Sequence, residues 1–268
     1  TRLTDLDFAD DLAILSDKAT NLQSMTDDLS EVASKVGLRI SSEKTKVMAV
    51  KESQPLTIDI NDQQAEEVSS FTYLGSKITN DGDVGPDIRS RLGKARGVFK
   101  RLLSKWTSTF LSLKSKMKLF KSLVIPVAIY ACETWKMTET QAHAINTFQQ
   151  QCLRRILKVN WRDHITNITI LERAESERLS DTIEKRRLKM LGHIIRMPDN
   201  RHAKTSLEWR PPRGRRRRGR PVNTWRRTIL KDLEQRNLTW EDAQNLAPDR
   251  DGWRTLVVAQ CPNRDRKT

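Results

Sequence analysis

Two adjacent carboxylates, Asp10 and Asp11, stand between short apolar segments near the start of the chain. Apolar side chains such as Leu6 and Phe8 predict that residues 2–15 form two short strands joined by a tight turn at the aspartate pair. Like charges this close repel each other, and a divalent cation relieves that repulsion. Mg²⁺ prefers carboxylate oxygens and completes its shell with waters and substrate phosphates, which suits phosphoryl transfer. An isolated Asp-Asp pair is more often a solvated turn, so the pair alone is weak evidence for a metal site.

The segments that follow predict the scaffold of this turn. Apolar residues recur at spacings of three and four from Thr20 to Val36, and Gly37 stands where a helix C-cap belongs, so we predict a helix there. Strand-like stretches follow at residues 45–51, 56–60 and 70–78. The N-terminal part of the chain is therefore predicted to be a small α+β unit.

Beyond the polar turn at residues 79–83, the pattern changes from strands to helices. Apolar residues at helical spacing run from Ile88 to Ile195, which predicts an all-helical body. Prolines and an arginine run then predict an exposed arm, and Trp225 belongs to a tail that predicts one more helical hairpin. The predicted boundaries are residues 1–78 for the α+β unit, 79–196 for the helical body, 197–223 for the basic arm and 224–268 for the C-terminal segment.

The charge of the chain is unevenly distributed. The 49 Lys and Arg residues against 34 Asp and Glu residues give a formal net charge of +15. Residues 1–80 carry 8 basic and 14 acidic residues, a net charge of −6, which leaves +21 for residues 81–268. An acidic head on a basic body suits a metal-dependent site attached to a polyanion-binding surface. Ribosomal and chromatin proteins are basic too, so charge indicates a nucleic-acid partner without choosing an activity.

Cysteine usage and hydropathy limit the class of protein further. Cys132, Cys152 and Cys261 are far apart and lack metal-ligand spacing, which predicts reduced thiols in an intracellular protein and no zinc site. The longest apolar stretch, residues 123–132, is far too short to cross a membrane, and no cleavable signal opens the chain. Because the first residue is Thr1 rather than Met, we expect a fragment of a longer reading frame.

Four motifs follow one another in a definite order. They are Phe-Ala-Asp-Asp at residues 8–11, Gly-Leu-Arg-Ile through Lys-Thr-Lys at 37–46, Phe-Thr-Tyr-Leu-Gly at 71–75, and an acidic turn that leads into a basic helix from Asp87. In this order they resemble the reverse transcriptases of non-LTR, LINE-type retrotransposons, over essentially the whole chain. The resemblance implies an α+β fold, with a partial polymerase palm of hairpin, helix and small antiparallel sheet, then an all-helical thumb and a basic C-terminal extension.

The first two motifs would supply the catalytic residues of such an enzyme. Residues 8–11 resemble the family's Tyr/Phe-x-Asp-Asp box, whose carboxylates hold two metals, Mg²⁺ or Mn²⁺. By that resemblance Asp10 is the more direct ligand and Asp11 its neighbour. Residues 37–46 resemble the family's Gly-Leu-x-Ile-x-x-x-Lys-Thr segment, where Lys44 would donate a proton to the leaving pyrophosphate or steady its charge. The alternative for Lys44 is an ordinary surface lysine.

The third motif resembles the primer grip, a hairpin that positions the 3′ end of the primer at the metals. A glycine there lets backbone approach backbone or phosphate closely, and Tyr73 would face a sugar or a base. For Phe71 and Leu74, packing within a strand is an alternative role that can hold at the same time. The candidate primer-grip residues are Phe71, Tyr73, Leu74 and Gly75.

The helical body would take the place of the thumb, whose helices follow the template–primer duplex through phosphate contacts. Such contacts tolerate different sequences and weaken with salt. The alternative for each basic residue is a solvated helix face. Residues 129–135 resemble a Tyr-Gly-x-Glu-Thr-Trp run of these elements, with Ala131 in place of the usual glycine, and we assign them to packing. The candidate contact residues are Arg89, Arg91, Lys94, Arg96, Lys100 and Arg101.

Two readings of the basic arm stay open. Residues 218–221, Arg-Gly-Arg-Pro, have the form of an AT-hook core whose arginines enter a narrow minor groove. The alternative, which we favour, is a nonspecific polybasic arm or nuclear-localisation signal. Residues 192–197, with 219–221 and Trp225, resemble the end of LINE-type proteins, where a role in holding template RNA or target DNA follows by analogy. His193 is expected to be a helix-end residue rather than a ligand. The candidate arm residues are Arg215, Arg216, Arg217, Arg218 and Arg220.

The resemblance implies an RNA-directed DNA polymerase that copies retrotransposon RNA into DNA. Its partners would be template RNA, primer DNA, target chromosomal DNA and deoxynucleoside triphosphates, in the nucleus and in a cytoplasmic ribonucleoprotein phase. The family's fingers, its earlier palm aspartate and its endonuclease have no counterpart in this sequence, so we expect the chain alone to be inactive. The main alternative is a noncatalytic, basic nucleic-acid-binding remnant, which shares every basic feature but has no reason to place Asp10 and Asp11 among apolar residues.

Overall fold

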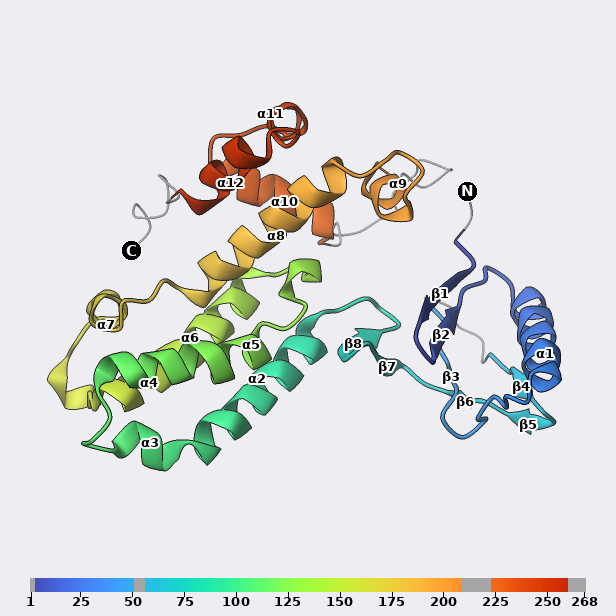
Figure 1. Ribbon diagram of the computed structural model, residues 1–268, viewed down its shortest axis with the longest axis horizontal. Helices are drawn as coiled ribbons and strands as arrows, with labels where there is room; N and C mark the ends of the chain where they lie inside the picture. The colour runs from blue at the N-terminus through green and yellow to red at the C-terminus, as the bar shows by residue number, and fades with distance from the viewer. Residues whose placement is uncertain (1–2, 51–55, 209–222, 260–268) are drawn as a thin grey trace. The chain divides into compact units, whose positions relative to one another are not determined.

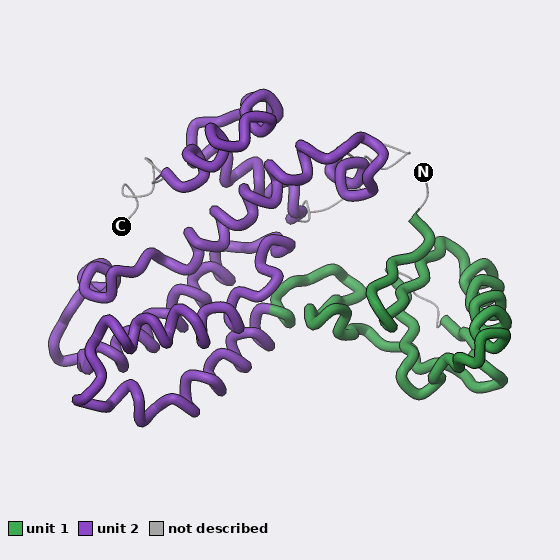
Figure 2. Tube along the Cα trace, viewed as in Figure 1, with its two compact units in different colours: residues 1–87 green, residues 88–268 purple. Residues whose placement is uncertain are grey.

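The computed structural model describes residues 3–50, 56–208 and 223–259 and combines helices with small sheets (Figure 1). The chain divides into two compact units, residues 1–87 and residues 88–268 (Figure 2). The mixture of short strands and helices agrees with the predicted α+β class. No helix in the described ranges is long and apolar enough to cross a membrane.

Within residues 3–50 and 56–87, the strands of the N-terminal unit form four separate two-stranded sheets. Three are antiparallel ladders, and one, β3 with β6, is parallel. The predicted stretch 70–78 is a hairpin of two strands, because Leu74 and Gly75 form a turn in its middle. The strands are β1 (Asp5–Phe8), β2 (Asp11–Ile14), β3 (Lys46–Val47), β4 (Asp59–Ile60), β5 (Gln63–Gln64), β6 (Glu66–Glu67), β7 (Ser70–Tyr73) and β8 (Ser76–Thr79).

The helix of this unit, α1 (Ala19–Lys35), lies within one residue of the predicted bounds. It ends as predicted, because Gly37 adopts φ +78°, the left-handed conformation that terminates helices and favours glycine. The hydrophobic core beside α1 is small and consists of four buried residues, with Leu22, Ile40 and Leu56 packed against it. The four are Val47, Ile58, Ile60 and Ala65.

The helical unit begins within α2 (Gly85–Arg101) and contains helices alone among its described residues. Pro126 lies in a helical stretch that continues past it, and a π-helical turn precedes it, since proline cannot donate the backbone hydrogen bond that a regular helix requires. The predicted arm of residues 197–223 contains a helix, α9 (His202–Glu208), because Leu207 is buried in the core beside α8. The other helices that precede it are α3 (Leu103–Thr107), α4 (Leu113–Leu119), α5 (Ile125–Ala128), α6 (Glu139–Leu157), α7 (Asn167–Arg173) and α8 (Leu179–Ile195).

Helix α6 provides much of the central core of this unit. Thr138 and Gln141 form a capping box at its N-terminus, and the left-handed Lys158 ends it. Both α7 and α8 contact it. Its buried face consists of Ile145, Phe148, Gln149, Cys152, Leu153 and Ile156.

The C-terminal segment, which the structure describes to residue 259, holds three helices rather than the predicted single hairpin. The extra helix arises because Thr239 and Asp249 each cap a new start, so two short helices follow α10. All three share a core with the end of α8, centred on Leu191, Ile229 and Trp253. The helices are α10 (Trp225–Glu234), α11 (Trp240–Leu246) and α12 (Arg250–Val258).

Candidate functional site

The aspartate pair lies at the tip of the β1–β2 hairpin. Phe8 pairs with Asp11 in the ladder, which leaves Ala9 and Asp10 as the two-residue turn. The turn therefore begins one residue before the predicted Asp10–Asp11 turn, because Asp11 already belongs to β2. Ala9 adopts φ +54°, a conformation that two-residue hairpin turns require and that a residue with a Cβ adopts at a cost.

The surroundings of the pair leave it open to solvent. Both aspartates are exposed, and Phe8 beside them is 63% exposed. Within the part of the chain that the structure describes, no group of three or more His, Cys, Asp or Glu side chains is placed to hold a metal ion. Two adjacent carboxylates still offer hard oxygen ligands, and exposure leaves room for the waters and phosphates that Mg²⁺ keeps. The pair thus fits two positions of a metal site whose other positions need other ligands.

The predicted catalytic lysine, Lys44, lies in a different segment of the N-terminal unit from the aspartate pair. It is exposed on a turn at residues 42–44, between α1 and β3. Among the described residues, no ion pair joins Lys44 to Asp10 or Asp11. The predicted catalytic lysine is therefore accessible but not held at the aspartates.

The hairpin β7–β8 carries the residues that resemble a primer grip. Its two-residue turn places Leu74 at φ +46° and Gly75 at φ +80°, the pair of positive angles typical of a type I′ turn. Glycine adopts this conformation freely, whereas leucine does so under strain. The Tyr73 hydroxyl donates to the backbone carbonyl of Leu6 at 3.3 Å. This bond connects the β7–β8 hairpin to β1, so Tyr73 has a structural partner within the unit.

The predicted contact residues on α2 fall into two groups. Arg89, Lys94, Arg96, Lys100 and Arg101 are exposed, and of these Arg96 also lies over a ring, with its guanidinium carbon 5.6 Å from the centre of Phe148. Arg91 is buried, and its guanidinium carbon lies 4.3 Å from the centre of the Tyr130 ring, a cation–π contact. Arg91 therefore packs the helix against its neighbours, and five of the six predicted side chains remain on the surface.

Two glycines lie on the same face of α2, Gly93 exposed and Gly97 half-buried. A methyl group added to Gly93 or Gly97 would meet nothing within 4 Å, so neighbouring protein atoms do not explain either glycine. Each glycine inside a helix costs about 1 kcal/mol relative to alanine. With 3.6 residues per turn, Gly93 and Gly97 lie between a row of basic residues and a basic pair. The row is Arg89, Arg96 and Lys100, and the pair is Lys94 and Arg101.

The basic region extends well beyond α2. Residues 88–132 contain 11 Lys and Arg residues and no Asp or Glu. Such a run concentrates positive potential on the helices that it forms. The residues predicted at the sequence level cover only the first part of this run, and the absence of any acidic residue over its full length is the signal that would have revealed the rest.

The motif at residues 129–135 serves packing, as predicted. Ala131 adopts φ +54°, which explains why glycine is usual at this position of the motif. The Glu133 carboxylate accepts from Arg186 Nε at 2.6 Å, and the Glu133 backbone carbonyl accepts from Trp225 Nε1 at 2.7 Å. Glu133 thus joins α8 and α10 to the segment after α5.

The motif at residues 192–197 also has a structural use. The position of a Cβ on Gly192 would lie 2.3 Å from Nε1 of Trp253, so only glycine allows the tryptophan ring to lie against α8. The same Nε1 donates to the Leu188 carbonyl at 3.0 Å. Arg196 donates to the Ala247 carbonyl at 2.6 Å, while His193 is exposed in the last turn of α8. These residues attach the C-terminal helices to α8.

Residues 215–220 of the arm lie outside the described residues.

Sequence reasoning missed two buried ion pairs in the helical unit. Arg187 Nε lies 2.6 Å from an Asp232 carboxylate oxygen, and Arg187 also donates to the Trp135 carbonyl at 3.2 Å. Arg236 Nε lies 3.1 Å from a Glu184 oxygen. The partners are 45 and 52 residues apart in the chain, so no local pattern could have announced them.

The thiols of Cys132 and Cys152 are buried, and burial raises the pKa of each to about 12. For Cys132 the neighbouring Glu133 carboxylate raises it further, and Arg186 and Arg187 oppose this. Because the thiolate is the reactive form, both groups are chemically quiet at ordinary pH. Both thiols are free and serve packing, while Cys261 lies outside the described residues.

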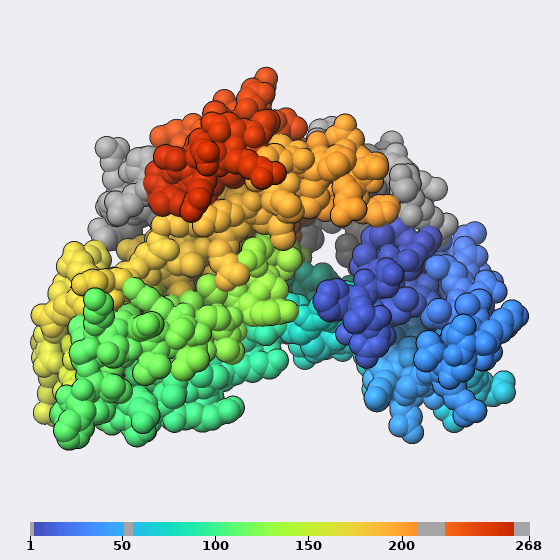
Figure 3. Space-filling view, viewed as in Figure 1, coloured from blue at the N-terminus to red at the C-terminus, as the bar shows by residue number. Residues whose placement is uncertain are grey.

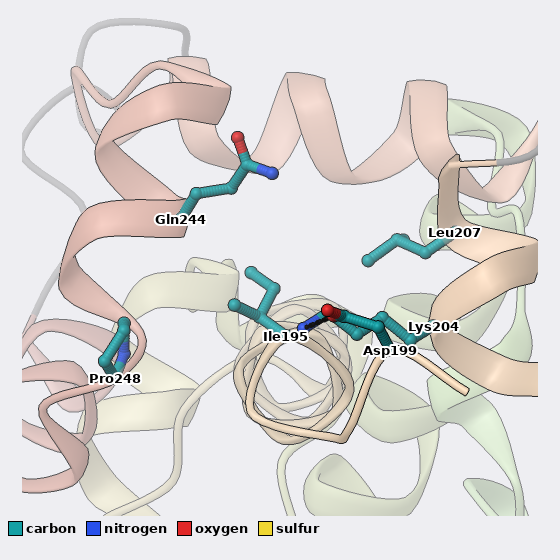
Figure 4. A pocket seen from close by; sticks show the side chains of 6 residues that line it. All are labelled: Ile195, Asp199, Lys204, Leu207, Gln244 and Pro248. Atoms are coloured by element: carbon teal, nitrogen blue, oxygen red, sulfur yellow. Dashed lines mark ion pairs between the residues drawn. The ribbon is translucent and has the colours of Figure 1, made fainter. Parts of the chain in front are cut away.

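A pocket of about 330 Å³ lies at the C-terminal end of α8 (Figure 4). Lys204 and Asp199 form a 2.7 Å ion pair at its wall, and the hydrogen bond from Lys204 lowers the pKa of Asp199. The pocket contains none of the predicted site residues. Its lining is Ile195, Asp199, Lys204, Leu207, Gln244 and Pro248.

Comparison with known proteins gives two positive findings. The model of the family described as reverse transcriptase (RNA-dependent DNA polymerase) matches residues 3–78, which include both hairpins. A transposon-derived protein of Caenorhabditis elegans is 26% identical over 274 residues, with 97% of each chain covered. No solved structure matches.

Both similarities point to the same class of protein. Residues 3–78 are similar to the reverse transcriptase family, and the alignment with the transposon-derived relative also covers the helical unit. These similarities support a reverse transcriptase from a retrotransposon.

Proposed function

We propose that this chain is the C-terminal part of a LINE-type RNA-directed DNA polymerase that copies retrotransposon RNA into DNA at a chromosomal 3′ end. The observation that carries the proposal is the place of Asp10 and Asp11, at an exposed hairpin tip inside the segment that matches reverse transcriptases. In this proposal residues 1–78 are part of the palm and the helices after them are the thumb. In this proposal the polymerase acts in the nucleus.

Asp10 and Asp11 would hold Mg²⁺, with Asp10 as the more direct ligand. The ion, when bound, supplies charge stabilisation for nucleotidyl transfer. Leu74 and Gly75 form an exposed turn that is strained at Leu74, and strained, exposed residues of this kind occur at sites that contact ligands. The β7–β8 hairpin would hold the primer, and its bond from Tyr73 to Leu6 would keep that primer in register with the aspartate hairpin.

The helical unit would bind the template–primer duplex through α2. Gly93 and Gly97 leave the helix backbone bare, so that a sugar–phosphate backbone can approach closely between two basic walls. Arg89 and Lys100 stand on one wall and Arg101 on the other. The two glycines cost helix stability and gain nothing from protein packing, which supports a role in binding.

Primer extension tests the proposal. By family resemblance the reaction also needs an aspartate from an earlier strand, which has no counterpart here, so we expect no incorporation by this chain alone with an annealed RNA template and DNA primer. Supplying the preceding region of an intact element in trans is expected to restore metal-dependent incorporation, and Asp10→Ala is expected to abolish it. Restored incorporation that survives Asp10→Ala would contradict the metal-binding role.

A noncatalytic nucleic-acid-binding protein is the second candidate. It is favoured by one observation, that the two aspartates have no third metal-ligating partner among the described side chains. Under this alternative the chain binds duplexes through α2, and no addition in trans restores incorporation. Binding measured beside incorporation therefore separates the two functions.

A further inference from the structure

Two aromatic rings of the helical unit are exposed in the connections between its α-helices. Phe110, between α3 and α4, is 99% exposed, and Trp161, in the one-turn 3-10 helix Trp161–Asp163 after α6, is 77% exposed. Most other aromatic side chains of α2 to α6 pack instead: Phe99 and Trp106 stack with ring centres 5.0 Å apart, and Phe148 is buried in α6, while Tyr130 is half-exposed beneath Arg91. Rings exposed this completely contribute nothing to the core.

The Phe110 loop is held in place by its own hydrogen bonds. The Phe110 amide donates to the Ser108 hydroxyl at 3.2 Å, and the buried Lys116 ammonium donates to the Ser108 carbonyl at 2.7 Å. The Ser112 hydroxyl then accepts from the Ser115 amide and caps α4. The ring is thus presented by an ordered loop, which reduces the conformational entropy lost when a ligand binds.

The Trp161 loop is constrained in a similar way. The left-handed residues Lys158, at φ +57°, and His164, at φ +48°, bracket it. Inside it, the Asn160 amide donates to the Asp163 carboxylate at 2.7 Å. The guanidinium carbon of Arg162 lies 5.5 Å from the centre of the Trp161 ring. The two left-handed residues and the cation–π contact therefore hold the exposed Trp161 ring in a fixed position.

The two loops lie at the same end of the helical unit (Figures 1 and 3). Helices α3 and α4, which flank Phe110, both contact α6, and Trp161 follows the C-terminus of α6. Basic residues predominate in the segments that flank both rings, and Asp163 is held in its own turn. Exposed acidic residues, Glu172 and Glu175, follow only on and after α7. The exposed basic residues nearby in the chain are Lys105, Lys114, Lys118, Arg155, Lys158 and Arg162.

We propose that Phe110 and Trp161 form a stacking site for the bases of a single-stranded nucleic acid. Every base has a π-face, and an aromatic ring among cations binds single strands by stacking on bases while the cations hold the phosphates. The acid-free run of residues 88–132 extends from α2 into the Phe110 loop, so the single strand would continue the path of the duplex on α2. This step rests on the proposed function only for the duplex, since stacking itself needs neither metal nor polymerase activity.

Fluorescence anisotropy with labelled strands of about 15 nucleotides tests the site on the full chain without metal or nucleotides. We expect Phe110→Ala and Trp161→Ala each to weaken single-strand binding about tenfold and duplex binding less than about twofold. Phe110→Leu keeps apolar area without a π-face and is expected to bind as weakly as Phe110→Ala, whereas Phe110→Tyr is expected to bind normally. Ile168→Ala, which also removes an exposed apolar side chain, is the matched control.

The outcomes separate the alternatives. Parallel RNA and DNA strands show which single strand is preferred, and either preference supports the site. Single-strand binding within about twofold of the parent in both alanine variants would overturn it. Full single-strand binding by Phe110→Leu would also overturn the site, in favour of a hydrophobic contact. Variants that bind single strands normally but no longer bind anionic vesicles would overturn it in favour of a membrane contact. Absence of primer extension would leave this result unaffected, because the two measurements are independent.

Discussion

The two units of the chain differ in how well their functional side chains are supported. In the N-terminal unit, the side chains around the aspartate pair are exposed, and the core consists of four small or medium-sized residues. In the helical unit, large side chains such as Phe148 and Trp253 are buried and two ion pairs are sealed inside. The predicted catalytic residues therefore rest on a weak scaffold, and the predicted binding residues rest on a firm one. The free energy of unfolding should differ between the units accordingly.

The largest difference in unfolding free energy should come from removing one phenylalanine side chain in each unit. Phe148→Ala empties a buried site and is expected to cost about 3–5 kcal/mol of unfolding free energy, while Phe8→Ala, at 63% exposure, should cost less than about 1 kcal/mol. All seven tryptophans lie in residues 88–268, so their fluorescence in urea reports the helical unit, and far-ultraviolet circular dichroism reports both units. Equal costs would break the comparison.

The buried ion pair gives a second contrast. Arg187→Ala removes the guanidinium that pairs with the buried Asp232 carboxylate and is expected to cost about 3–5 kcal/mol. Lys35→Ala removes the exposed pair with Glu31 and should cost less than about 0.5 kcal/mol. Urea unfolding measures both costs. A loss of unfolding free energy below about 1 kcal/mol for Arg187→Ala would show that the pair is not buried in solution.

A smaller effect is expected at the contact between α8 and α12. Gly192→Ala places a methyl group against the Trp253 ring and should cost about 1–3 kcal/mol. The double variant Gly192→Ala with Trp253→Leu should recover part of the loss attributable to the clash, measured as a coupling energy in a double-mutant cycle. Additive costs would mean that the two positions do not touch.

Relief of backbone strain should stabilise the chain, in contrast to the preceding substitutions, which destabilise it. Ala131→Gly and Ala9→Gly each relieve a positive φ and are expected to stabilise by at most about 1 kcal/mol. Tryptophan fluorescence should detect the gain for Ala131→Gly only, since Ala9 lies in the other unit. Destabilisation in both cases would show that neither residue adopts the left-handed conformation.

The thiols test burial without changing stability. In a Cys261→Ser background, Cys132 and Cys152 should remain unreactive toward a thiol reagent at pH 8, because burial raises each pKa to about 12 and keeps the neutral form. Unfolding in urea should release both thiols to reaction. Rapid labelling of the folded chain would contradict the packing around α6.

Local features of the fold could be predicted from sequence, because they depend on local chemistry. The β1–β2 hairpin, α1 with its cap at Gly37 and the helices around α6 follow from apolar spacing and caps. Other features depend on residues far apart in the chain. The burial of Arg91 on Tyr130 and the contact between Gly192 and Trp253 could not be predicted, because no pattern near one partner points to the other.

The candidate site divides in the same way. The aspartate pair and the basic face of α2 were visible in sequence, since both consist of neighbouring residues. The one-residue shift of the turn was not, because only the pairing of Phe8 with Asp11 fixes it. The exposed rings of Phe110 and Trp161 also escaped sequence reasoning, since an aromatic residue in a helical region is normally assigned to the core.

The most direct test of the account is the double variant Gly93→Ala with Gly97→Ala. Helix propensity predicts that it raises the unfolding free energy of the helical unit by up to about 2 kcal/mol, since nothing within 4 Å opposes either methyl group. If α2 binds a nucleic-acid backbone between its basic walls, the same variant should bind a template–primer duplex about tenfold more weakly. Greater stability with unchanged or tighter binding would contradict the claim that this face of α2 is a nucleic-acid interface.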